Sequence, residues 1–444
     1  MEVFTFPNGL RVATERTHAR SVTVSCWVET GSRFESPVQL GSSHFLEHLL
    51  FRGTGRRDRV AISHSIEEVG GELNAFTSRE YTCCYARVPQ SELGLAIDLV
   101  ADLVMDPSLP ADQVEPERTV VLQEIAQSLD TPNDAIYDLI YEALFPGHSL
   151  AQPAYGSSDS VLRLTRGSLA DYHRDRYRPA AMAVAIVGPV DHQEAVERLG
   201  ETTLGRDSTR GPETAWRRAS PPSEPLLPIL VHERQSPVVH VLLAARGVSY
   251  GDPNRPAVEV LSAILAGLPT ALIPLELRDR RGLAYEISSY HSCLSDSGVL
   301  GVYLCVSSDQ ALAAVRCALD ILADGRNGQF SDDLVARSIR YLRGRRFLDW
   351  ERTDEAIMRF GRHFLLGARS HGIDEDLAEL EAVDAQAVAN VAHNLLARPV
   401  LCAIGPISPS GMGNLLEERF DVPSSPLSTE TDPELMVSNP PGSD

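Results

Sequence analysis

A segment without apolar periodicity divides the sequence into two stretches, and this division constrains the fold more than any other feature. Between about residues 205 and 228 the chain is rich in Pro, Ser and charged residues, which is typical of a linker. The stretches on either side follow the same order of strand, helices, strands and helix. We therefore predict an α+β protein with two similar domains, residues 1–210 and 228–422, joined by a linker at 211–227. Each domain is expected to hold an antiparallel-rich sheet covered by helices.

Hydrophobic periodicity and turn residues predict the individual elements. Asn8-Gly9 marks a β-hairpin at the start of the chain. The first half is further expected to contain strands at 21–29 and 72–88 and helices at 41–52, 60–69, 93–105 and, as one long helical region, 113–144. The second half is expected to contain helices at 256–266, 270–280 and 309–323 and strands at 284–291 and 299–306.

Charge and composition exclude several classes of function. Forty basic against 61 acidic residues give a net charge of −21, which repels phosphate and argues against nucleic-acid binding. The N-terminus lacks the pattern of a signal peptide, and no apolar run of about 18 residues predicts a membrane span. The seven cysteines, odd in number, indicate reduced thiols and not a disulfide framework. We expect a cytoplasmic protein with a disordered tail at 423–444.

The segment GSSHFLEHLLFRGTG carries the clearest chemical signal. On a helix His44 and His48 project from one face, one turn apart, as two zinc ligands require. Glu47 lies beside them, where a carboxylate can take a proton from a zinc-bound water. This arrangement is the H-x-x-E-H motif, the inverse of the commoner H-E-x-x-H.

A third ligand is needed, and the helix PERTVVLQEIAQ offers two carboxylates. Glu117 and Glu124 are seven residues apart and therefore share one helix face. Spacing alone also fits two glutamates on a solvated face.

Three motifs, which occur in the same order in a known family, favour a metal site over a solvated face. HFLEHLLFRGT, GGELNAFTSREYT and ERTVVLQE closely resemble the pitrilysin superfamily of zinc peptidases, in particular its bacterial members that are like the mitochondrial processing peptidase beta subunit. The resemblance covers nearly all of residues 1 to about 420. It implies that His44, His48 and Glu124 bind one zinc ion per chain, that Glu47 is the general base, and that Glu117 assists catalysis without firm ligation.

The same resemblance implies the residues that bind substrate. In LRDRRGLAYEISSY, Arg278 and Tyr285 match a family pair that grips the substrate carbonyl and its developing oxyanion. Asn74, Ala75 and Phe76 match a strand that holds the substrate backbone; without the resemblance, Phe76 reads as a core residue.

One segment departs from the family pattern. Relatives that process presequences usually have a run of glycines before the helix that holds the arginine. This chain has AGLPTALIPLELRDRRGLAY, in which bulk replaces flexibility at Gly267 to Pro269. Substrate handling like that of the mitochondrial enzyme is therefore in doubt.

The resemblance implies a zinc endopeptidase that hydrolyses short unfolded peptides, or leader- and presequence-like segments, inside a closed clamshell chamber. A chain of this length supplies half of that chamber, so a homodimer is expected and a heterodimer with a related chain remains open. The alternative is a peptide-binding or assembly subunit that acts with a related partner chain, for example in leader-peptide removal during natural-product maturation.

Overall fold

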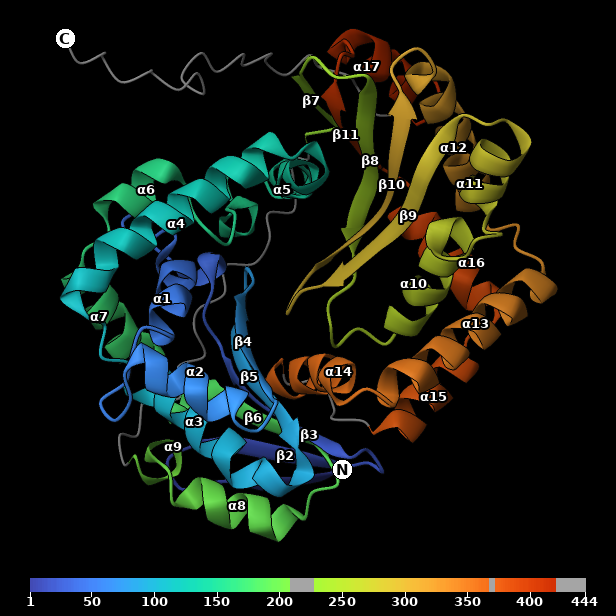
Figure 1. Ribbon diagram of the computed structural model, residues 1–444. Coiled ribbons are helices and arrows are strands. Elements are labelled where there is room, and N and C mark those ends of the chain that lie inside the picture. The colour runs from blue at the N-terminus through green and yellow to red at the C-terminus, as the bar shows by residue number, and fades with distance from the viewer. Residues whose placement is uncertain (208–226, 367–371, 421–444) are drawn as a thin grey trace, which may run out of the picture.

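Figure 1 shows the computed structural model, which describes residues 1–207, 227–366 and 372–420. Nearly all of the expected linker at 211–227, and all of the expected tail at 423–444, lie outside the described residues. Within them, the strands form two sheets, one drawn from each half of the chain.

The first sheet has the strand order β1-β2-β6-β3-β5-β4. All neighbouring strands run antiparallel except β2 and β6. Its described strands are β1 (Glu2–Thr5), β2 (Arg11–Arg16), β3 (Ser21–Val28), β4 (Glu72–Thr77), β5 (Thr82–Pro89) and β6 (Met182–Gly188).

The second sheet has the order β7-β11-β8-β10-β9, with β7 and β11 parallel and the other pairs antiparallel. Apart from the extra edge strand β1, the two sheets share one topology, which confirms the predicted α+β fold with two similar halves. Its described strands are β7 (Ile229–Glu233), β8 (Val238–Gly247), β9 (Ala284–Cys293), β10 (Gly298–Ser307) and β11 (Val400–Gly405).

Apolar helix faces build a separate core on each sheet. The first half contains α1 (Ser42–Leu50), α2 (Arg59–Glu67), α3 (Leu93–Met105), α4 (Ala111–Asp130), α5 (Pro132–Leu144), α6 (Ser158–Arg163), α7 (Arg166–Arg176), α8 (His192–Gly200) and α9 (Thr203–Arg206), and the 3-10 turns η1 (Ser32–Phe34), η2 (Gln90–Glu92), η3 (Ser149–Ala151) and η4 (Pro179–Ala181). The second half contains α10 (Arg255–Ser262), α11 (Leu272–Pro274), α12 (Ala311–Arg326), α13 (Asp332–Trp350), α14 (Thr353–Leu365), α15 (Ile373–Glu381), α16 (Ala385–Leu395) and α17 (Pro409–Glu417), and the π-helical segments η5 (Ala263–Gly267) and η6 (Leu275–Arg280).

The stretch from Arg255 to Arg280 is the one described segment that is long and apolar enough to cross a membrane. Two thirds of its most apolar window are buried inside the protein, where α10 and η5 join the core of the second sheet. It therefore belongs to the core by position, and an apolar stretch of this length was not identified from the sequence.

Each half lends one helix to the sheet of the other half (Figure 1). Helix α5 packs on β8 and β11, with Ile140 and Leu144 fully buried there. Helix α14 packs on β3 and β6 of the first sheet through Ile357 and Phe360. Burial of each such side chain contributes about 1.5–3 kcal/mol, so the exchange ties the halves into one structure.

Two expected elements are divided in the structure. The predicted strand 72–88 is the hairpin of β4 and β5, because Ser78 forms a turn by bonding through its hydroxyl to the backbone of Tyr81. The predicted helical region 113–144 breaks between α4 and α5 at Thr131, since Pro132 disfavours a helical conformation in the preceding residue.

Candidate metal centre

One face of helix α1 is buried in the core, and the predicted metal-binding residues lie on its other face. Phe45, Leu46 and Leu49 are fully buried, which turns His44 and His48 toward α4.

A buried carboxylate holds the start of this helix in place. Glu35 accepts hydrogen bonds from the backbone N–H groups of Gly41 and Ser43, each at 2.7 Å. These N–H groups lack partners within the helix, so Glu35 does the work of an N-terminal cap. Burial raises the pKa of Glu35, against the effect of its hydrogen bonds from Ser43 and Gly41.

The long helix α4 supplies the third expected ligand. The Oε2 atom of Glu124 lies 3.2 Å from Nε2 of His48 and 3.7 Å from Nε2 of His44. Donor atoms of the three side chains all lie within 4.8 Å of one another. Zinc bonds of about 2.0–2.1 Å in a tetrahedral shell place neighbouring ligand atoms about 3.3 Å apart, so the spacing and the His-His-Glu donor set fit a zinc ion with an open fourth position.

The local electrostatics favour ligation. Burial, and to a smaller extent His48, lowers the pKa of His44 to about 4, so its imidazole is neutral at neutral pH and offers a lone pair. Burial also raises the pKa of Glu47, an effect that the hydrogen bond from Thr77 opposes. A carboxylate with a raised pKa is a better proton acceptor.

Glu117 lies beside the cluster and not in it. Its Oε2 atom is 3.3 Å from Nδ1 of His48, and its Oε1 atom is 2.5 Å from Arg52 Nη2. Glu117 therefore orients the His48 ring, and Arg52 holds Glu117 in place. A carboxylate that binds the second ring nitrogen is the usual partner of a metal-bound histidine. This position fits the expectation that Glu117 assists without ligating. Arg52, which lies in the turn just after α1, was not predicted from the sequence.

The expected substrate strand is the edge strand β4, but its side chains divide between the two faces of the sheet. Thr77 faces α1 and donates a 2.6 Å hydrogen bond to Oε2 of Glu47, a contact that the sequence did not predict. Ala75 lies in the core beneath α1, and its N–H donates a 2.8 Å hydrogen bond to the side chain of Asn74. Phe76 packs on the opposite face against Trp27, so its side chain is structural, and only its backbone remains available to a peptide.

The structure does not bring Arg278 and Tyr285 to the metal cluster. Arg278 bonds to Asp279 and to the carbonyl oxygen of Pro269, and Tyr285 is 93% exposed. In Figure 1, α11 and the start of β9 lie on the right, whereas α1 lies on the left. Within the described part of the chain, neither residue has a hydrogen bond or ion pair with His44, His48 or Glu124.

Within the segment Gly267 to Pro269, Leu268 is packed and Pro269 is exposed. Leu268 is buried against Ala263 and Ala271.

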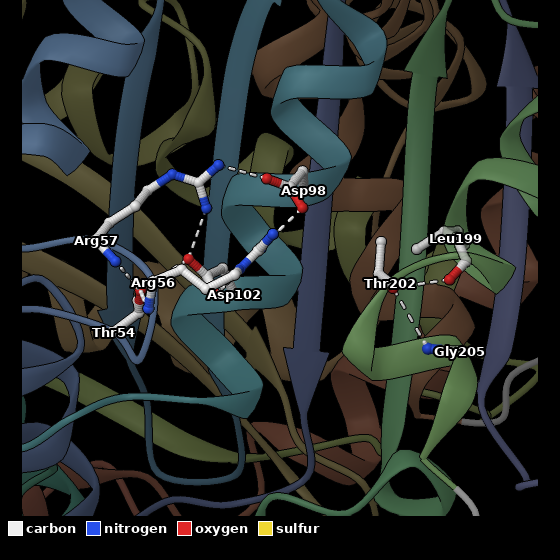
Figure 2. Close-up of polar contacts among 8 residues, drawn as sticks. All are labelled: Thr54, Arg56, Arg57, Asp98, Asp102, Leu199, Thr202 and Gly205. Carbon is white, nitrogen blue, oxygen red and sulfur yellow. Dashed lines mark hydrogen bonds and ion pairs between the residues drawn. The ribbon is translucent and has the colours of Figure 1, made fainter.

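The loop that follows α1 is fastened to α3 (Figure 2). The buried Asp102 accepts hydrogen bonds from Thr54 at 2.8 Å and from Arg57 at 2.7 Å, and Asp98 binds Arg56 and Arg57. These contacts fix the backbone just beyond the two histidines.

A two-domain α+β fold with a His-His-Glu cluster and an adjacent carboxylate is that of a metallopeptidase. Comparison with known proteins agrees: residues 11–158 match the model of the insulinase family, peptidase family M16, and residues 163–342 match that of the M16 inactive domain. The chain belongs to peptidase family M16, the pitrilysin-type zinc peptidases.

Three relatives illustrate the similarity. An uncharacterized zinc protease of Streptomyces coelicolor is 34% identical over 417 residues, which cover 91% of this chain and 89% of that protein. A probable mitochondrial-processing peptidase subunit beta of Arabidopsis thaliana is 31% identical, over 91% of this chain and 78% of that protein. The crystal structure of a protease from Helicobacter pylori has the same fold, with a TM-score of 0.83 at 19% identity over 91% of this chain and 99% of that one.

Proposed function

We propose that the protein is a zinc-dependent endopeptidase that hydrolyses short unfolded peptides or leader- and presequence-like segments. The observation that carries this proposal is the convergence of His44, His48 and Glu124, with Glu47 on the same helix face and held by Thr77. The names of the relatives, which include zinc proteases and a mitochondrial-processing peptidase subunit, support the same class.

His44, His48 and Glu124 would hold one zinc ion per chain. Bound there, zinc supplies Lewis acidity: it makes water more acidic and polarises a peptide carbonyl. Glu47 accepts the proton of the attacking water and returns it to the leaving amine. Thr77 keeps the Glu47 carboxylate in position through its hydrogen bond, and Glu117 keeps the His48 ring in position.

The edge of β4 is the proposed site for the substrate backbone. An extended peptide beside β4 would add a strand to the first sheet, and the N–H of Ala75, which donates to the Asn74 side chain, is one donor for that peptide. The side-chain oxygen of Asn74 accepts the hydrogen bond from this N–H, and a carbonyl oxygen of the bound peptide would replace it.

We further propose a homodimer in the cytoplasm. Because Arg278 and Tyr285 lie far from the zinc cluster of their own chain, a second copy would bring its pair to that cluster and close a chamber between the chains. The free state of all seven cysteines supports a reducing compartment. A related partner chain in place of the second copy is the alternative, and the name of the Arabidopsis relative, a subunit, is what supports it.

Hydrolysis of a quenched fluorescent peptide library by the zinc-loaded protein tests the proposal. Cleavage by the wild-type chain that disappears in Glu47→Gln, while both proteins bind one zinc ion, is the expected result. Equal peptide binding by both proteins with no cleavage by either would overturn the endopeptidase and favour a peptide-binding subunit.

A further inference from the structure

A cavity of about 480 Å³ lies in the second half of the chain, between α10, β9, α13 and α14. None of the residues of the metal centre lines it. Ser289 and His291 of β9 form one wall, and the π-helical segment η5 contributes Ala263 and Gly267. Its volume is that of a small-ligand site, and π-helical turns recur at such sites.

Four arginines and three carboxylates line this cavity. Arg255, Arg346 and Arg359 share two buried acidic groups: Glu259 contacts Arg255 at 3.0 Å and also binds Arg346, and Asp376 lies 3.3 Å from Arg346 and 3.0 Å from Arg359. Each of the other acidic groups nearby either forms an ion pair with another arginine or is partly exposed to solvent. Asp349 is paired with Arg345, and Glu355 is paired with Arg352. Glu379 lies beside Arg255, and its side chain is 40% exposed.

A fourth arginine, Arg362, lines the cavity with no acidic partner. Over the whole described chain, no ion pair joins it to a carboxylate, and its buried Nε atom has no hydrogen-bond partner. Its guanidinium lies over the ring of Tyr81, 5.7 Å from the centroid. A buried cation without a counter-charge is costly, so a bound anion would relieve that cost.

The arginines contribute to the pKa shifts of two neighbouring groups. Burial would raise the pKa of Glu259, but Arg359, Arg346 and Arg255 outweigh it and lower that pKa to about 2. Burial, together with Arg255 and Arg359, lowers the pKa of the adjacent His363 to about 3.

The internal duplication places this cavity where the first half has its metal centre. In the first half, α1 packs on the edge strand β4 and on α4, and the ligands come from α1 and α4. In the second half, α10 packs on the edge strand β9 and on α13. Arg255 and Glu259 lie four residues apart on α10, the same spacing as the two histidines on α1. The corresponding place in the second half thus carries a cavity lined by arginines.

We propose that this cavity is a binding site for an oxyanion, a carboxylate or phosphate group, held by Arg362 and Arg359. Arginine suits this role because its planar guanidinium binds both oxygens of such a group at once. The opposite face of α14 packs on the first sheet, so the bound anion joins that helix to α10 and α13 and stabilises the contact between the two halves.

Thermal unfolding of the full-length, zinc-loaded protein tests the site. The probes are inorganic phosphate, succinate, and a tripeptide with either a free or an amidated C-terminus, each compared with sodium chloride at matched ionic strength. We expect at least one oxyanion to raise the melting temperature, and Arg362→Gln to weaken its apparent affinity about tenfold or more. Arg340→Gln removes an exposed arginine of α13 that does not line the cavity, and it should leave the response unchanged.

The pattern of responses identifies the source of the group. Stabilisation by phosphate or succinate indicates a free anion, whereas stabilisation by the free-acid tripeptide alone indicates the end of a peptide. An equal response in Arg362→Gln would place the anion elsewhere, for example on zinc, and would overturn the proposal. The absence of a response to every probe would also overturn it.

A second variant covers the case in which Arg362→Gln does not fold. Ser289→Asp puts a carboxylate on the cavity wall contributed by β9. It should raise the melting temperature in anion-free buffer and abolish the response to added oxyanion. An undiminished response in this variant also contradicts the proposal.

Discussion

At the scale of single residues, the metal centre depends on carboxylates that do not themselves bind the metal. Glu117 fixes the ring of His48, and Glu35 fixes the first turn of α1 through two backbone N–H groups. The Nδ1 atom of His44, by contrast, is buried with no hydrogen-bond partner in the described structure. The two histidines are therefore not equivalent: the orientation of His48 is set by a partner, and that of His44 is set by packing.

Removal of the partner of His48 should weaken the metal site. We expect Glu117→Ala to lower zinc affinity about 10- to 100-fold, because the ring loses its acceptor and Arg52 is left without its carboxylate. Competition with a zinc chelator measures this affinity. Asp112→Ala, at an exposed position in the first turn of the same helix, is the matched control. An unchanged affinity in Glu117→Ala would assign Glu117 a purely structural role.

Acid should destabilise the protein partly through His363. Its pKa in the folded state is about 3, below the 6.5 of a free imidazole, so between these values the unfolded chain binds more protons. The resulting loss of stability begins as pH falls below about 6.5 and is complete near pH 3, with a size of up to about 5 kcal/mol. Urea unfolding of the zinc-free His363→Phe protein should show a shallower loss over that range than the zinc-free wild type. Parallel curves would exclude His363 as a source of the acid sensitivity.

At the scale of elements, α14 is fitted to the first sheet by a glycine. A Cβ atom at Gly361 would lie 2.0 Å from Nε1 of Trp27, a fully buried side chain of β3. The tryptophan cannot move aside easily, because its N–H donates a 2.7 Å hydrogen bond to Ser25.

Two glycine substitutions should therefore have opposite effects. Gly361→Ala should destabilise the protein by about 1–3 kcal/mol through overpacking, despite the higher helix propensity of alanine. Gly344→Ala in α13, where an added Cβ meets nothing within 4 Å, should stabilise by about 0.5–1 kcal/mol. Denaturant unfolding measures both. A neutral effect of Gly361→Ala would mean that α14 moves freely over the sheet.

The elements themselves were only partly predictable from sequence. The H-x-x-E-H helix and the strands of the hairpin regions were readable because periodicity and turn residues are local signals, whereas β6 and β11 were not predicted. The turn between β4 and β5 was missed because it contains no glycine or proline, and the hydrogen bond from Thr77 to Glu47 joins elements that periodicity cannot relate. The packing of α5 on the second sheet and of α14 on the first sheet depends on tertiary contacts. The sequence of an amphipathic helix does not specify which sheet the helix covers.

At the scale of the whole molecule, the turns of two hairpins join the halves. Asp296, between β9 and β10, binds the buried Arg33, which also binds Glu80 in the turn between β4 and β5. Ser295 donates to Glu80 from its backbone and its hydroxyl. The role of Arg278 and Tyr285 stays a prediction, because the resemblance implies that the pair reaches the zinc site of the partner half and the single chain holds no partner.

Mixed dimers test whether that pair acts between chains. If Tyr285 of one copy serves the zinc cluster of the other, then Glu47→Gln and Tyr285→Phe, each inactive or weakly active alone, should regain activity when combined. One site of the mixed dimer is then intact, so about half of the wild-type activity per dimer is expected. A mixture that stays as inactive as its parts would show that the pair acts within its own chain.

The exchange of helices also bears on how the protein is made. The first sheet is complete once β6 has been synthesised, but the helix that covers its second face, α14, starts about 165 residues later. While the ribosome adds those residues, Trp27 and the alanines of β6 face water or a chaperone. The nascent N-terminal half therefore carries an uncovered apolar face until the chain is nearly finished, and fragments that stop short of residue 353 should aggregate instead of folding.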